Sequence, residues 1–204
     1  MKYFILAFAL VALSACGKKW GDSAPYLPQS KAPIAVEIPP DAPFIGQQYQ
    51  ATDEEQGVPG HLGIDMWGDR GTPVIAAAPG RVTRAFFDPA YGRRITIDHG
   101  TDETGQRVLT QYFHMSDFDA EVGDTVLRGE QIGKMGGSGF LGVIIHVHFE
   151  VLRGPTRSRA RTEDPNLFWE GGVGKVTCFD RNKTYPKDRF VTVSPAVCRG
   201  DSPL

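Results

Sequence analysis

Two histidines separated by one residue, His146 and His148, are placed where they can act on one centre. They lie in the segment 145–152, which alternates in the way that strands do. Because side chains alternate across a strand, both imidazoles share a face with Glu150. The opposite face is apolar and is predicted to belong to the core (Val147, Phe149, Val151). We expect solvent exposure for Glu150, although it could also orient a metal ligand.

A second pair of polar residues, His61 and Asp65, lies four residues apart. Gly60 and Gly63 disfavour a helix there, so the segment is predicted to be a loop that enters a strand. One imidazole and one carboxylate from this loop, with one imidazole from the His-x-His strand, make three N/O ligands. Catalytic zinc sites typically use three protein ligands and keep a fourth position open. Any one histidine alone could be an ordinary structural residue, but the combination favours a metal site.

The two remaining histidines differ in their surroundings. His114 ends a predicted strand over 108–114, where alternation places it on the face of Tyr112 and predicts that both can point into the same groove. Tyr91 and Phe140 could line that groove too, although aromatic packing explains all three rings equally well. His99 opens a turn, and we expect it to have a structural role.

The elements that must position these residues are short. Apolar runs at 73–76, 81–86, 94–98, 108–114 and 145–152 read as strands, separated by turn signals. No sustained helical period occurs between 44 and 154, and the chain has 24 glycines and 15 prolines. The expected fold is therefore mainly antiparallel β. The segment 137–142 fits a GxGxxG pattern but precedes a strand, so it predicts a flexible rim and not a dinucleotide site.

Composition excludes several classes of function. The chain has 204 residues, 41% hydrophobic and 23% charged, with a formal net charge of -2. This suits one ordinary domain with extensions. A dedicated nucleic-acid binder would need a strongly basic surface, so no nucleic-acid partner is expected. No apolar run reaches the roughly 18 residues of a membrane-spanning helix.

The first residues read as an export signal. Lys2 is followed by an apolar stretch and by small residues, which predicts a signal peptide over 1–15. Residues 13–16 (Leu-Ser-Ala-Cys) resemble a bacterial lipobox, in which Cys16 becomes lipidated and anchors the chain to a membrane. Gly17 follows where Asp usually retains lipoproteins in the inner membrane, so the outer membrane facing the periplasm is expected. Residues 16–43 carry six prolines and read as a tether, with a possible edge strand at 34–38.

The C-terminal extension over 155–204 carries the two other cysteines. In an oxidising compartment Cys178 and Cys198 are expected to form a disulfide, although two free buried thiols remain an alternative. Four arginines crowd around the start of the extension (Arg153, Arg157, Arg159, Arg161). They read as a solvated loop or, less favoured, as a contact for an anionic polymer.

The segment from His61 to Glu150 resembles the lysostaphin/LytM-type zinc endopeptidases, which cut peptidoglycan cross-links. The resemblance is carried by motifs in matching order and spacing: His61-Leu-Gly-Ile-Asp65, Gly71-Thr-Pro-Val74, Ala78-Pro-Gly-Arg-Val82, Ile97-Asp-His-Gly100, Tyr112-Phe-His-Met115 and His146-Val-His-Phe-Glu150. It implies a groove of the duplicated-hybrid-motif type within 44–154. It also implies zinc ligands and catalytic histidines (His61, Asp65 and His148; His114 and His146). Ile145 departs from the pattern, which usually has Pro there.

These observations predict a zinc-dependent endopeptidase acting on peptidoglycan stem peptides, with one Zn²⁺ per chain and as a monomer. The alternatives are a non-catalytic relative that activates wall amidases and a peptidoglycan-binding lipoprotein. The cross-link that is cut, D-Ala to diaminopimelate or Gly–Gly, stays open. The segment 44–59 lies just before the first ligand and could cover the groove in a latent form.

Overall fold

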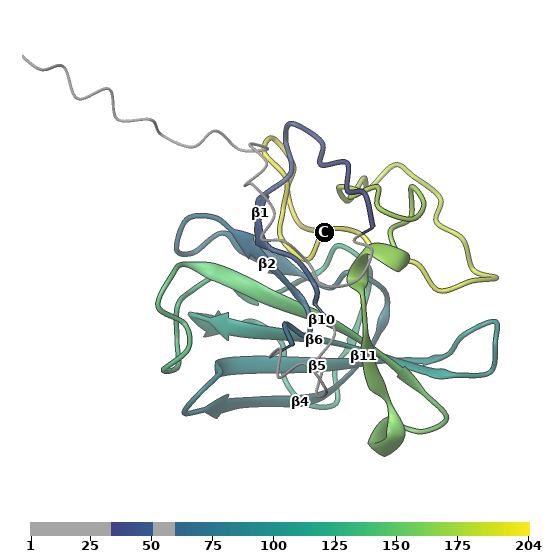
Figure 1. The fold of residues 1–204 in the computed structure, drawn as a ribbon, viewed down its shortest axis with the longest axis horizontal. Helices are drawn as coiled ribbons and strands as arrows, with labels where there is room; N and C mark the ends of the chain where they lie inside the picture. Colours follow the sequence, from purple (N-terminus) through teal and green to yellow (C-terminus); the bar gives the residue numbers. More distant parts are fainter. Residues whose placement is uncertain (1–33, 51–59) are drawn as a thin grey trace, which may run out of the picture.

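The computed structural model describes residues 34–50 and 60–204 (Figure 1). Two turns of 3₁₀ helix, η1 (Arg157–Arg159) and η2 (Pro165–Leu167), are the helical segments of this described part. The strands are β1 (Phe44–Gln47), β2 (Ile64–Trp67), β3 (Pro73–Ile75), β4 (Gly80–Asp88), β5 (Gly92–Thr101), β6 (Arg107–Met115), β7 (Asp117–Phe118), β8 (Thr125–Val126), β9 (Gln131–Lys134), β10 (His146–Gly154) and β11 (Arg161–Glu163).

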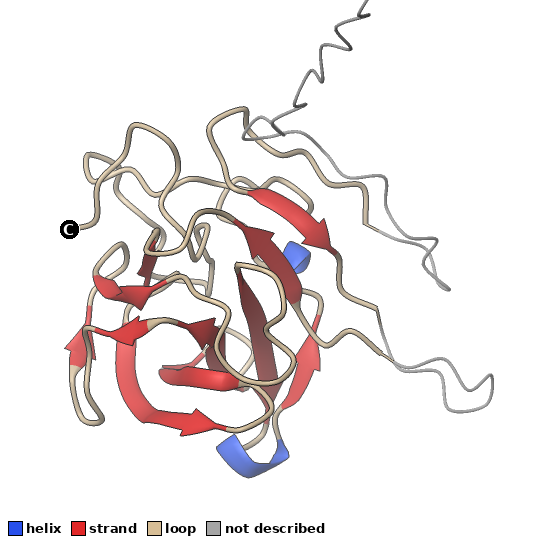
Figure 2. Ribbon diagram, turned by 90° about the vertical axis from the view of Figure 1, so that its left-hand side faces the viewer, coloured by secondary structure: helices blue, strands red, loops and turns tan. Residues whose placement is uncertain are grey.

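The strands form two antiparallel sheets, which confirms the expected fold class. The larger has the order β1-β2-β10-β6-β5-β4-β8, with β11 also paired to β10. Its long central strands lie side by side in Figure 1. The smaller sheet has the order β3-β9-β7, and Figure 2 shows how the strands curve around the interior.

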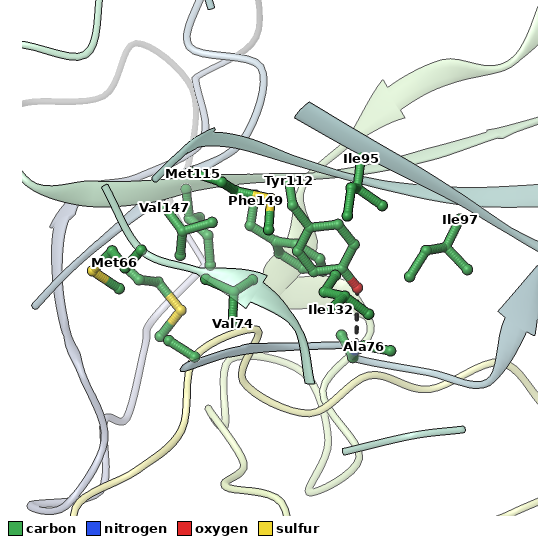
Figure 3. Packing of buried hydrophobic residues seen from close by; sticks show 14 of the residues in the cluster. Met66, Val74, Ala76, Ile95, Ile97, Tyr112, Met115, Ile132, Val147 and Phe149 are labelled. Carbon is green, nitrogen blue, oxygen red and sulfur yellow. Dashed lines mark hydrogen bonds between the residues drawn. The ribbon is translucent and has the colours of Figure 1, made fainter. Parts of the chain in front are cut away.

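The hydrophobic core lies between the two sheets. Tyr112 and Phe149 of the large sheet are fully buried there and face Val74 and Ile132 of the small sheet (Figure 3). The hydroxyl of Tyr112 would be costly to bury without a partner, and it accepts a hydrogen bond of 2.9 Å from the backbone N–H of Ala77. This bond joins the central strand β6 to the loop that follows β3.

Strand β10 positions the His-x-His pair as alternation predicts. Val147, Phe149 and Val151 point into the core and are fully buried. His146 and His148 therefore point to the other face of the sheet. In the register, β2 lies on one side of β10, where Asp65 is opposite His148, and β6 lies on the other, where Phe113 is opposite His148.

The C-terminal extension belongs to the same core as the sheets. Trp169, Val176 and Ala196 are among the buried residues of that cluster. Cys178 and Cys198 form a disulfide that closes a separation of 20 residues, as expected. In the chain-entropy description such a bridge contributes about 3 kcal/mol to stability.

The described part of the proline-rich stretch, residues 34–43, packs on this extension. Glu37 forms a β-bridge with Lys175, and Ala42 is fully buried. The predicted signal peptide, Cys16 and the rest of the tether lie outside the described residues. Within the part of the chain that the structure covers, no helix has the length and apolar character needed to cross a membrane.

Two of the four neighbouring arginines form ion pairs with buried carboxylates. Arg157 joins Arg107 on the carboxylate of Asp98, whose side chain is 2% exposed. The Nε of Arg153 donates to Asp102 over 2.6 Å. The prediction of a solvated loop is therefore wrong for Arg153, whose side chain is 23% exposed, whereas Arg157 is 55% exposed as predicted although it pairs with a buried acid.

His99 has the structural role that was expected. Its Nδ1 lies 2.8 Å from the carbonyl oxygen of Pro79, and its Nε2 lies 2.8 Å from Oγ1 of Thr110. Since a carbonyl only accepts, Nδ1 carries the proton, and Nε2 contacts the threonine hydroxyl oxygen. Burial lowers the pKa of His99 to about 4. The imidazole is consequently neutral in the folded chain at physiological pH.

We predict that His99 makes stability depend on pH between about 4 and 6.5. The unfolded chain binds a proton there that the folded chain does not, so stability is complete above pH 6.5 and falls as the pH is lowered towards 4. The loss is about 1–3 kcal/mol. Denaturant titrations of wild type and His99→Gln over this range measure it, and the variant should show a flatter slope. Equal slopes in both proteins would contradict the assignment.

Candidate metal centre and active site

Three side chains from separate parts of the sheet converge on one point. The Nε2 of His61 lies 3.2 Å from Oδ1 of Asp65 and 3.1 Å from Nδ1 of His148. The last edge, from His148 Nδ1 to Asp65 Oδ1, is 2.8 Å. Asp65 comes from β2 and His148 from β10, which pair directly, while His61 forms a β-bridge with Gln50 just before β2. The predicted ligand set is thus brought together.

The donor set fits a zinc ion. Zinc favours imidazole nitrogen and carboxylate oxygen, and ligand atoms around a tetrahedral zinc lie about 3.3 Å apart when the bonds are about 2.0 Å. The observed triangle of 2.8–3.2 Å is close to this spacing. These three residues can therefore hold a metal ion.

In each histidine of this candidate ligand set, the ring nitrogen that faces away from the triangle also has a partner. His61 Nδ1 donates to the backbone oxygen of Gln48 over 2.7 Å, and His148 Nε2 lies 3.2 Å from the carboxylate of Glu150. Such contacts fix ring orientation and make the inner nitrogen the free one. The expectation that Glu150 is exposed is wrong: its side chain is only 12% exposed, because it turns along the sheet onto His148.

The charges of this cluster support one another. Burial by itself would raise the pKa of Asp65, but hydrogen bonds with His148 and His61 hold it well below its usual range. Burial likewise disfavours the imidazolium of His148, yet its hydrogen bonds with Asp65 and Glu150 raise its pKa to about 9. Without a metal, a proton on His148 thus supplies part of the positive charge that the two carboxylates require.

The other two histidines lie beside this triangle, and in each of them Nδ1 contacts a backbone carbonyl oxygen. His146 Nδ1 is 2.8 Å from the backbone oxygen of Ile144, and His114 Nδ1 is 2.9 Å from the backbone oxygen of Ser138. Both carbonyls can only accept, so in each neutral imidazole Nδ1 carries the proton and Nε2 has a free lone pair. The two ring centroids are 4.7 Å apart.

His114 reaches this place because the strand is broken there. It is the one residue other than glycine with a positive φ, 60°, among the described residues. That conformation is uncommon for a residue with a Cβ and is typically found at functional sites. It ends the alternation of β6, so Phe113 contacts the ring of His148 while the next residue, His114, also lies at the site.

The sequence prediction that Tyr112 shares the groove with His114 is therefore wrong. Tyr112 is fully buried in the core. The positive φ at His114 directs the His114 ring to the opposite face of the sheet. Strict alternation from Tyr112 would have put His114 in the core. Its pKa is lowered by burial and by the neighbouring His146 and His148, which favours the neutral ring.

A cleft of about 560 Å³ is lined by the three candidate ligands, the two neighbouring histidines and Glu150. Gly46 and Gln47 of β1 line this cleft. Tyr91, whose side chain is 43% exposed, also lines it. The described part of segment 44–59 thus borders the cleft. A second cleft of the same volume lies against residues 186–191, but its single histidine, His99, has both nitrogens engaged and offers no ligand.

One rim of the cleft is apolar and tied to the β4–β5 turn. The N–H groups of Phe140 and Leu141 donate to the backbone oxygens of Pro89 and Ala90 over 2.9 Å. Phe140 does not line the cleft and is 83% exposed. The same segment supplies the Ser138 oxygen that orients His114. The glycine-rich stretch therefore holds a site residue, a role that its sequence did not indicate.

Comparison with known proteins identifies a family. Residues 59–162 match the model of Peptidase family M23. The chain is 33% identical over 145 residues to outer membrane antigenic lipoprotein B of Haemophilus influenzae, covering 71% of this chain and 32% of that protein. It is 29% identical over 102 residues to peptidoglycan DD-endopeptidase ShyC of Vibrio cholerae, covering 50% and 22%. The chain thus spans less than two thirds of the length of these relatives.

A solved structure has a similar fold. It is a mutant of the catalytic domain of EnpA, a prophage-encoded M23 protein from Enterococcus faecalis, at 25% identity and a TM-score of 0.51. The superposition covers 65% of this chain and 95% of that domain.

The contact between Glu150 and His148 leads to a prediction on metal affinity. Replacing Glu150 by Ala frees the His148 ring, so we expect zinc to bind roughly 10- to 100-fold more weakly. Glu150→Gln keeps an acceptor oxygen and should lose less. Competition with a chromophoric chelator gives the dissociation constants. Glu163→Gln, on β11 away from the ligands, serves as the control, and a Glu150→Ala protein with the affinity of this control would contradict the role.

Proposed function

This chain belongs to peptidase family M23, and on that premise we propose that it is a zinc-dependent endopeptidase that hydrolyses peptide cross-links of bacterial peptidoglycan. The observation that carries the proposal is the convergence of His61, Asp65 and His148 within 3.2 Å, with two further histidines beside them in one cleft. Non-catalytic relatives that only bind a partner have no need of all five groups.

His61, Asp65 and His148 are the proposed zinc ligands. When bound, zinc acts as a Lewis acid that polarises a carbonyl and acidifies water. The chain's own contribution is to hold the three donors in place. Gln48 and Glu150 contact the two rings from behind and fix their orientation, and the hydrogen bonds from His148 and His61 keep Asp65 ionised in spite of its burial.

His114 and His146 are the proposed catalytic residues. In the neutral form of each ring, Nδ1–H donates to a backbone carbonyl and Nε2 is left without a proton beside the proposed ligands. An imidazole in this tautomer can take a proton at Nε2 from the attacking water and later give it to the departing amine. Once Nε2 has taken this proton, its N–H can also donate a hydrogen bond to the oxyanion of the tetrahedral intermediate. The geometry supports both histidines equally for these two tasks.

The substrate assignment rests on family and relatives. The relative from V. cholerae is named a peptidoglycan DD-endopeptidase, and the family match over residues 59–162 includes all three proposed metal ligands. A stem peptide is an extended chain, and the cleft between β1 and Tyr91 can receive one. We propose that the protein acts as a monomer on such peptides. Mass spectrometry of the released fragments identifies which cross-link is cut.

We further propose that the chain is exported and anchored by lipid on Cys16 to the outer membrane. Cys16 lies outside the described residues, so support comes from the lipobox, from the lipoprotein relative and from the disulfide. Disulfides persist in oxidising compartments such as the periplasm. Residues 1–15 would be removed as the signal peptide.

Replacing His114 should abolish hydrolysis without removing the metal. His114→Ala is expected to lower kcat by 10²- to 10⁴-fold, because a positioned acid–base group is lost, while one zinc per chain is retained. Chelation of wild type should also stop hydrolysis, and added zinc should restore it. Release of muropeptides from purified peptidoglycan measures the activity.

His99→Gln is the matched control for this experiment, since His99 lies outside the cleft and should leave hydrolysis intact. Full activity of the His114→Ala protein would overturn the catalytic assignment. Retention of wall polymer by wild type with bound zinc but without any cleavage would instead support a binding protein.

Lipid anchoring is tested by changing Cys16 to Ser. The variant cannot receive acyl chains and should move from the membrane fraction to the soluble fraction, because several buried chains are needed for stable anchoring. Fractionation followed by immunoblotting reads this out. A Cys16→Ser protein that stays in the membrane fraction would contradict the anchor.

A further inference from the structure

A series of buried polar contacts connects the C-terminal extension to the ligand His61. The indole Nε1 of Trp169 donates to Oδ1 of Asn166 over 2.9 Å. The Nδ2 of Asn166 donates to Oε1 of Gln48 over 2.9 Å. The backbone oxygen of Gln48 in turn accepts from Nδ1 of His61 over 2.7 Å. Trp169, Asn166 and Gln48 are 1%, 2% and 8% exposed.

This connection lies outside the part of the chain that matches the family. Gln48 precedes residues 59–162, and Asn166 and Trp169 follow them. The two flanking segments therefore meet behind a ligand that the matched region provides. They are held there by the core, because Trp169 packs in the main cluster and the Cys178–Cys198 disulfide closes the extension.

The side-chain amide of Gln48 is unfavourable for the stability of the folded chain. Its Nε2 is buried and has no hydrogen-bond partner among the described residues, and an unmade hydrogen bond of this kind is unfavourable. An apolar side chain of similar shape would avoid that cost. The amide has one hydrogen bond, to Asn166, and Asn166 is itself fixed by Asp164, which accepts from both its backbone N–H and its Nδ2 over 2.9 Å.

We propose that Asn166 is a positioning residue for the metal centre, acting through Gln48 on His61. This inference rests on the metal-binding part of the proposed function. The amide bond to Asn166 anchors the side chain of Gln48, and the backbone pair between Gln50 and His61, with both N···O distances 2.8 Å, anchors the following residues. Between these anchors the Gln48 carbonyl is aimed at Nδ1 of His61, which directs Nε2 towards Asp65 and His148.

The test uses the full chain with Gln48→Met as the main variant. Methionine keeps the length of the side chain, removes the unpaired Nε2 and leaves the backbone carbonyl in place, so the thermal midpoint should stay close to that of wild type. Zinc affinity, measured by chelator competition, should nevertheless fall about tenfold. Asn166→Leu breaks the same bond from the other side and should give at least the same loss of affinity.

Thr177→Val is the matched control. Thr177 accepts from the N–H of Gly171 and donates to the oxygen of Lys175, so the variant loses two hydrogen bonds in the same extension without changing the contact with Gln48. It should bind zinc as wild type does. A second readout is the ¹⁵N shift of the His61 ring in the metal-free protein. It should report one tautomer, protonated at Nδ1, in wild type and Thr177→Val, and a mixture in Gln48→Met.

The outcomes separate this inference from the proposed function. Unchanged zinc affinity in both Gln48→Met and Asn166→Leu would overturn the positioning role alone. Wild type that binds zinc with the expected shifts in the variants, but cleaves no peptidoglycan, would support the positioning role and overturn the hydrolase. A wild-type chain that binds no zinc would overturn both. If Asn166→Leu does not fold, Gln48→Met decides the question.

Discussion

The molecule depends on holding two imidazole nitrogens and one carboxylate oxygen within 3.2 Å of one another. Such a cluster is unfavourable unless a positive charge is shared among its members, because a buried carboxylate needs a partner. In the metal-free chain that charge is a proton on His148, because its hydrogen bonds with Asp65 and Glu150 raise its pKa, while the imidazole partners of Asp65 hold the pKa of that carboxyl low. A metal ion can take over the same role, so the site is polarised for a cation before one arrives.

The pleat of β10 makes this cluster compatible with a stable fold. Every second residue of the strand is an apolar residue of the core, and the residues between them carry the chemistry. A shift of register by one residue would bury His148 and expose Phe149, so the core that stabilises the sheet also fixes the ligands. Close packing between the His61 loop and β10 also fixes the positions of these side chains. At Gly63 a Cβ would come within 2.3 Å of the backbone oxygen of Phe149, so only glycine lets the His61 loop approach β10.

His114 is the exception to this regularity. Its positive φ interrupts β6, separates its ring from the core face of Tyr112 and places it 4.7 Å from the ring of His146. The conformation is unfavourable for a residue other than glycine and is maintained by contacts around it. The backbone N–H of His114 donates to Tyr91, and its ring donates to Ser138. Both partners lie in the segments between strands, so two loops hold the residue that the strand pattern alone would have pointed into the core.

The sequence by itself determined the antiparallel fold, the two faces of β10, the disulfide and the five histidine and aspartate positions that meet in the cleft. The fold and the two faces follow from local rules: the period of two in a strand and the turn residues between strands. The disulfide follows from the pair of cysteines in a chain with an export signal, and the full set of site residues follows from motifs that resemble a known family. Only the tertiary structure decided the direction of His114, the contact of Glu150 with His148, and the approach of Asn166 to Gln48. Each depends on where distant backbone segments lie, and a local pattern carries no information about such distances. A positive φ at a histidine and an amide pair 118 residues apart in sequence leave no periodic signal that could be read in advance.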